Sequence, residues 1–119
     1  MTRLTEPNRM WHVTLTVGGD AVEPLIVRNA LRRLNEQRPF LHSLRYAAAC
    51  AELMYWDEGE TLVDASSLAL RLWNEHRGSA GLPRWQVLGL EVLERDVFRE
   101  RGREGQGVVD LLQVDPVPF

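Results

Sequence analysis

The chain has one cysteine, no lysine and no long apolar run, and each absence narrows what it can be. A single cysteine cannot form an internal disulfide. No apolar stretch approaches the roughly 20 residues of a membrane span, and none follows a basic start as in a secretion signal. These features predict a soluble cytoplasmic protein with no membrane partner.

Basic charge is also scarce. The 14 basic residues, all arginine, stand against 17 acidic ones, which gives a net charge of −3. This balance does not favour binding to a phosphate backbone, and the glycine-aromatic signature of RNA-binding sheets is missing. Nucleic acid is therefore not an expected partner.

The chain is the size of one domain. With 119 residues, 45% of them hydrophobic and 26% charged, it can bury a single core and is not globally disordered. We expect a flexible leader over 1–9 and a single α+β domain over 10–95. Residues 96–119 read as a charged linker followed by an apolar C-terminal tail.

The first half of the domain predicts a strand and then a helix. Apolar and polar residues alternate from Trp11 to Val17, which is typical of a strand with one buried face. Asp20 followed by Glu23 has the form of a capping box, and Pro39 ends the helix that should follow.

The stretch from Phe40 to Glu58 allows more than one interpretation. Alternation on both sides of an alanine-rich junction favours two strands joined as a hairpin. The junction lacks the residues that tight turns prefer, so one long strand or a helix over 42–56 remains open. We favour the hairpin, because a sheet is needed to cover the neighbouring helices.

The second half predicts another helix and a last strand. Thr61 and Asp64 form a cap pair, apolar residues recur at helical spacing from Ala65 to His76, and Gly78 marks the end of the helix. Trp85 to Glu94 alternates as a strand, which places Leu88 on the helix-covered side of the sheet.

The order strand, helix, strand, strand, helix, strand resembles the ferredoxin-like fold. It predicts a four-stranded antiparallel sheet with both helices on one face. The other face should be bare, and its apolar members indicate a covering partner or ligand. By strand parity the bare face carries His12, Thr14, Thr16, Ser43, Arg45, Glu52, Met54, Trp56, Val87, Glu91 and Leu93.

Four stretches carry a second resemblance: "PFLHSLRYA", "YWDE", "LALRLWNEHR" and "GLEVLERD". They are similar to a family of small proteins of unknown function from high-GC actinobacteria. The resemblance implies no activity and transfers no catalytic residue.

His12 is the candidate with the most specific chemistry. It shares the bare face with Glu52, Arg45 and Glu91, and a carboxylate could orient it as a general base. The blander interpretation is a solvated or interface histidine. Further candidates for ligand or interface contact are Met54, Trp56 and Trp85.

No metal or cofactor is predicted, because the three histidines show no ligand spacing: His12, His42 and His76. The sequence predicts a noncatalytic association or regulatory module that acts as a homodimer through the bare face or the tail. The alternative is a small-molecule-binding protein or small enzyme with a pocket on that face.

Overall fold

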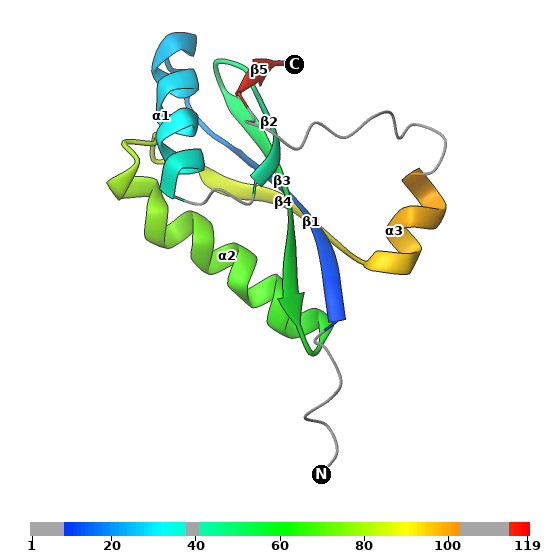
Figure 1. The fold of residues 1–119 in the computed structure, drawn as a ribbon. Coiled ribbons are helices and arrows are strands. Elements are labelled where there is room, and N and C mark those ends of the chain that lie inside the picture. The colour runs from blue at the N-terminus through cyan, green and yellow to red at the C-terminus, as the bar shows by residue number, and fades with distance from the viewer. Residues whose placement is uncertain (1–8, 38–40, 103–114) are drawn as a thin grey trace.

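The computed structural model describes residues 9–37, 41–102 and 115–119 (Figure 1). Its elements are β1 (Arg9–Gly18), α1 (Pro24–Gln37), β2 (Leu41–Tyr46), β3 (Cys50–Gly59), α2 (Leu62–Ser79), β4 (Gln86–Glu94), α3 (Arg95–Gly102) and β5 (Val117–Pro118). The first six follow the predicted order. Most of the predicted leader, and 103–114 of the predicted linker and tail, lie outside the described residues.

The strands form one sheet in the order β4-β1-β3-β2-β5. β1 pairs antiparallel with both β3 and β4, and β2 pairs antiparallel with β3. The prediction of a four-stranded antiparallel sheet is wrong in one respect. The end of the chain returns to the edge of β2 and adds a parallel fifth strand, so the sheet is mixed.

Removing Val117–Phe119 tests this fifth strand. The segment pairs with Arg45 and Tyr46, and the Phe119 amide donates to the Tyr46 carbonyl at 3.0 Å. We expect its loss to lower the free energy of unfolding by about 1–2 kcal/mol, measured by urea denaturation. Phe119→Ala keeps the strand but removes the ring that the Arg45 guanidinium contacts, and should cost less. Equal effects would show that the ring alone holds the segment.

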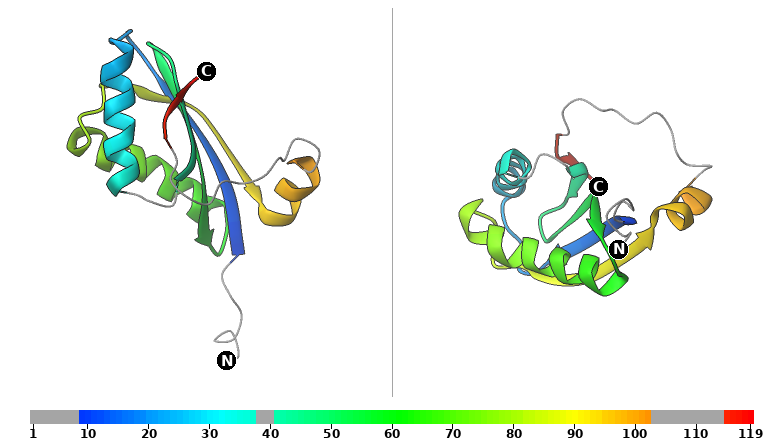
Figure 2. Two further views of the ribbon diagram at one scale, coloured as in Figure 1. Left: turned by 45° about the horizontal axis from the view of Figure 1, so that its top comes forward. Right: turned by 60° about the horizontal axis from the view of Figure 1, so that its bottom comes forward.

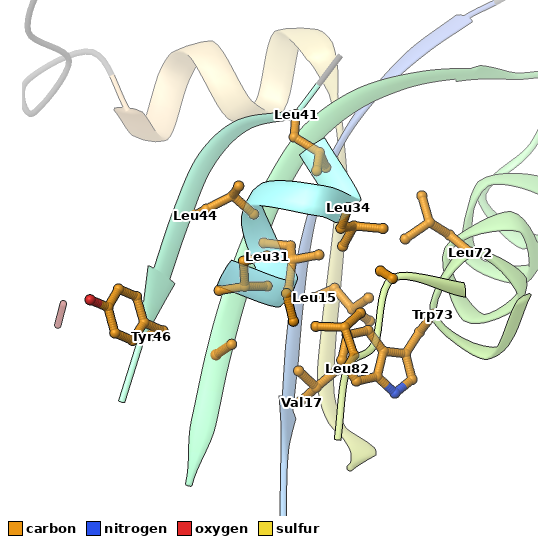
Figure 3. Packing of buried hydrophobic residues seen from close by; sticks show 14 of the residues in the cluster. Leu15, Val17, Leu31, Leu34, Leu41, Leu44, Tyr46, Leu72, Trp73 and Leu82 are labelled. Atoms are coloured by element: carbon orange, nitrogen blue, oxygen red, sulfur yellow. The ribbon is translucent and has the colours of Figure 1, made fainter. Parts of the chain in front are cut away.

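The core lies between the sheet and the two long helices. Val13, Leu15 and Val17 of β1 are fully buried on the face that α1 and α2 cover. Figure 3 shows Leu15 and Val17 packed with residues of both helices, among them Trp73. The period-two alternation of β1 and the helical spacing of α2 therefore meet in one apolar layer.

The two long helices differ in how well their starts were predicted. The Thr61 cap is confirmed, because its hydroxyl accepts a hydrogen bond from the Asp64 amide at 3.1 Å. The start of α1 at Asp20 is wrong, since the Val22 amide is bonded to Ala48 in the hairpin turn. The helix begins at Pro24, where the Glu23 carboxylate accepts from the Leu25 amide.

The predicted hairpin is confirmed over 41–58, with β2 and β3 paired antiparallel, and Phe40 lies outside the described residues. Its turn is closed by a hydrogen bond from the Ala47 amide to the Cys50 carbonyl at 2.8 Å. Alanines form this turn without a positive φ, which explains why the usual turn residues are not needed.

A β-bulge in β4 changes which residues face the core. Val17 pairs with Val87 but Thr16 pairs with Gly89, so Leu88 is an extra residue in β4. Strand parity placed Leu88 on the helix-covered side, and this is wrong: its side chain is 64% exposed. Val87, expected on the bare face, instead packs against the core.

Residues 96–102, predicted as part of a linker, belong to the helix α3. It follows β4 directly and contacts β1 and β4. It lies away from α1 and α2, beyond the end of β4 (Figure 2). Within the described residues, none of the helices combines the length and apolar character needed to cross a bilayer.

Candidate functional site

We call the sheet face opposite α1 and α2 the open face. At one end of it, four aromatic or imidazole rings meet: His12 of β1, His42 of β2, Trp56 of β3 and Phe98 of α3. His12 and Trp56 are direct partners in the β1–β3 ladder and so point to the same face. We call these four residues the ring cluster.

His42 reaches the ring cluster because β2 has a bulge. Leu41 pairs with Tyr55 and Ser43 pairs with Met54, which leaves His42 as an extra residue between them. Bulges redirect a side chain relative to strict alternation. Strict alternation would place His42 on the core side with Leu44, whereas the bulge turns it toward His12.

The two imidazoles are joined by a hydrogen bond, with His12 Nε2 and His42 Nε2 2.8 Å apart. The Phe98 ring stacks on His12, with centroids 3.8 Å apart and planes 23° apart. The Trp56 ring meets His12 edge-on at 5.0 Å. Only 1% of His12 is exposed, so these rings and the sheet shield it from water.

Both histidines are held in their neutral form. Burial, with a smaller contribution from His42, lowers the pKa of His12 from 6.5 to about 4. Burial also lowers the pKa of His42, against a hydrogen bond between its ring and its own backbone that raises it. A hydrogen bond between two neutral imidazoles requires that one Nε2 carries a proton and that the other accepts it.

This arrangement differs from the predicted acid–base site. His12 was expected to be oriented by a carboxylate, but its hydrogen-bond partner is another neutral imidazole. In the part of the chain that the structure describes, no group of three His, Cys, Asp or Glu side chains is placed to hold a metal ion.

Glu52 and Arg45, both predicted site residues, lie at the other end of the open face. They are direct partners in the β2–β3 ladder, and Thr16 of β1 lies on the far side of Glu52. Glu52 Oε1 is buried without a hydrogen-bond partner among the described residues. The Arg45 guanidinium lies over the Phe119 ring, 5.6 Å from its centroid.

Met54 and Glu91 flank the middle of β1. Both are partners of Thr14 on the open face, one from β3 and the other from β4. Glu91 is exposed, with Oε2 3.9 Å from a guanidinium nitrogen of Arg101 in α3. Of the predicted residues, Trp56 therefore lies against His12, whereas the others on this face are spread along it: Arg45, Glu52, Met54 and Glu91.

Trp85 lies apart from the other predicted residues. It is 2% exposed and belongs to the core on the opposite side of the sheet. Its indole donates to the Asp20 carbonyl at 2.8 Å, and its own carbonyl accepts from Trp73. These contacts position the loop before β4 rather than a ligand.

Sequence reasoning missed His42 and Phe98 as members of the ring cluster. The bulge that redirects His42 has no local signal, because both residues flanking it fit a regular strand. Phe98 lies in a segment that is dense in charged residues, and such a segment is typical of a linker. An aromatic residue in so polar a segment was the one available hint.

Comparisons with known proteins place this chain as follows. A family model described as "Domain of unknown function (DUF8830)" matches residues 10–109. No curated protein matches. Among solved structures, an acylphosphatase from Coxiella burnetii is 18% identical over 100% of both chains with a TM-score of 0.36. So low a TM-score supports no conclusion about this chain.

Proposed function

We propose that this chain, which belongs to the DUF8830 family, is a noncatalytic association module with a ferredoxin-like core that acts as a homodimer. One observation carries the proposal: among the described residues β4 pairs with β1 alone, while β5 pairs with β2 at the opposite edge of the sheet. An unpaired edge presents free N–H and C=O groups to another strand.

One side of α2 extends this edge with apolar surface. Val63, Leu70 and Arg77 are seven residues apart and so lie along the same side of the helix. Arg77 Nη1 donates to the carbonyl of Trp85, the residue directly before β4, at 3.2 Å. The C-terminal end of this side of α2 therefore lies beside the start of β4, and farther along the same side Leu70 is 40% and Val63 70% exposed.

We propose that a second copy of the chain binds along the β4 edge. A two-fold axis across β4 would join the two sheets and bring Val63 and Leu70 of both copies together. Each copy would then satisfy the edge of the other and bury the apolar side chains beside it.

The proposed interface is neither the open face nor the tail considered from the sequence. Phe98 covers the His12 end of the open face, and 117–118 pair with β2 of the same chain. Association is favoured over catalysis because His12 is buried and bonded to His42 rather than to a carboxylate. We also propose a cytoplasmic location, for which the lone cysteine is the support.

Leu70→Arg tests this interface by sedimentation at micromolar concentration. We expect two subunits for the unchanged chain and one for Leu70→Arg, because the added charge would be desolvated between the copies. Leu68→Arg is the matched control. Leu68 is 39% exposed on the same helix but two residues away, so it projects in a different direction.

The control is expected to remain dimeric with unchanged circular dichroism. A monomeric unchanged chain would overturn the homodimer. If both variants dissociated equally, the interface would not lie on the β4 side of α2.

A further inference from the structure

Among the described residues, one half-buried side chain packs α3 against the sheet. Of the α3 side chains whose burial the structure describes, Phe98 is half-buried and the other six are exposed. A helix of eight residues is too short to be stable alone in water. α3 therefore holds its place chiefly through the contact of Phe98 with His12 and Trp56.

The position of Phe98 depends in turn on the hydrogen bond between the two histidines, because its ring stacks on His12. The bond can form only while one of the two Nε2 atoms carries no proton and can accept. If both rings are protonated, two N–H groups and two positive charges face each other across 2.8 Å. The His12 ring would then have to turn away or reach water, and Phe98 covers it.

We propose that α3 is a proton-sensitive lid: protonation of the His12–His42 pair releases Phe98, and with it the helix, and uncovers His12 and Trp56. The device is independent of the homodimer, since neither histidine lies on the β4 edge or on α2.

The direction of the pH effect follows from linkage. Under the closed lid the pKa of His12 is about 4, whereas an exposed histidine keeps the value of 6.5. Above pH 6.5 neither state binds the proton, and the lid is unaffected. As the pH falls below 6.5 the open state binds protons first, so acid favours opening until about pH 4, where the closed state binds them too.

The size of the effect follows from the two pKa values. A shift of this size changes the ratio of open to closed forms by at most roughly 300-fold, and by roughly 50-fold between pH 7 and pH 4.5. These figures count His12 alone. Protonation of His42, whose pKa burial also lowers, acts in the same direction.

Other charged groups on the elements around His12 must be separated from this effect. Arg101 of α3 lies 3.9 Å from Glu91, and the Asp96 amide donates to the Glu94 carboxylate at 3.2 Å. The remaining charged residues on β1, β2, β3, β4 and α3 are Arg9, Arg45, Glu52, Asp57, Glu58, Arg95, Arg99 and Glu100. Of the charged neighbours, His42 is the one that lowers the pKa of His12.

Hydrogen exchange between pH 7 and pH 4.5 tests the lid. We expect the protection of the Arg99, Glu100 and Arg101 amides, corrected for the intrinsic exchange rate, to fall by roughly 50-fold or more. The amides of α2 serve as the internal reference and should not follow this drop. Phe98→Ala should remove the protection of the α3 amides already at pH 7.

Three variants test whether the drop in α3 protection comes from the histidine pair. His12→Phe keeps a ring beneath Phe98 but has no ring nitrogen, and should abolish the drop. His76→Gln changes the third histidine, which contacts Gln37 far from the ring cluster, and should leave the drop unchanged. Glu91→Gln removes the contact with Arg101 and should show the same drop in α3 protection as the unchanged chain.

If His12→Phe does not fold, His42→Gln gives the same information. It removes the neighbour that lowers the pKa of His12, so the drop should become smaller. The proposal is overturned if the unchanged chain shows no drop, if His12→Phe or His42→Gln shows the full drop, or if the α2 amides lose protection together with α3.

Discussion

Trp73→Ala is expected to lower the free energy of unfolding by about 3–5 kcal/mol, the largest effect of any substitution considered for this protein. Trp73 is 1% exposed at the centre of the core, between α2 and the sheet. Its indole Nε1 donates to the Trp85 carbonyl at 2.8 Å. Alanine would leave a cavity and remove this link between α2 and the loop before β4.

Trp73→Phe separates the cavity from the hydrogen bond. It keeps most of the buried ring and loses only the N–H donor, and the Trp85 carbonyl still accepts from Arg77. We therefore expect a loss of about 1–2 kcal/mol, measured by urea denaturation beside the alanine variant. If the two variants were equally destabilised, the hydrogen bond and not the packed volume would be the main contribution of Trp73.

Gly18→Ala is expected to destabilise the fold by about 1–3 kcal/mol through overpacking. A Cβ atom at this position would lie 2.7 Å from the backbone oxygen of Ala49 and 2.8 Å from Leu88 Cδ1. Gly18 pairs with Cys50 on one side and Gln86 on the other, so β1 cannot move away from either contact.

Gly78→Ala is the matched control and should have the opposite sign. Nothing lies within 4 Å of a Cβ at Gly78, which belongs to the last turn of α2. Alanine has the higher helix propensity, so we expect a gain of up to about 1 kcal/mol. Urea denaturation of both variants checks the pair. A neutral Gly18→Ala would mean that the β2–β3 turn yields to the added methyl group.

Local patterns were sufficient where structure depends on neighbours in sequence. Alternation over 11–17 predicted β1 and its buried face, and the Thr61 and Asp64 pair predicted the start of α2. Both signals act within a few residues. Asp20 and Glu23 gave an equally good local signal that failed, because the hairpin turn holds the Val22 amide through Ala48.

The ring cluster shows why the candidate site was only partly predictable. His12 and Trp56 were placed on one face by parity, which the β1–β3 register confirms. His42 depends on a bulge, and a shift of one residue moves a side chain to the other face of a strand. Phe98 depends on a contact between α3 and β1, for which its own charged segment gives no pattern.

The amino-acid sequence by itself determined the order of the first six elements, the apolar layer beneath the helices and the face that carries His12, since these follow from periodicity and caps. Only the tertiary structure decided that His42 is the partner of His12, that α3 covers them, that 117–118 pair with β2 and that β4 has one strand neighbour among the described residues. The physical reason is that bulges and long-range contacts are selected by the packing of the whole sheet, and no short stretch of residues encodes them.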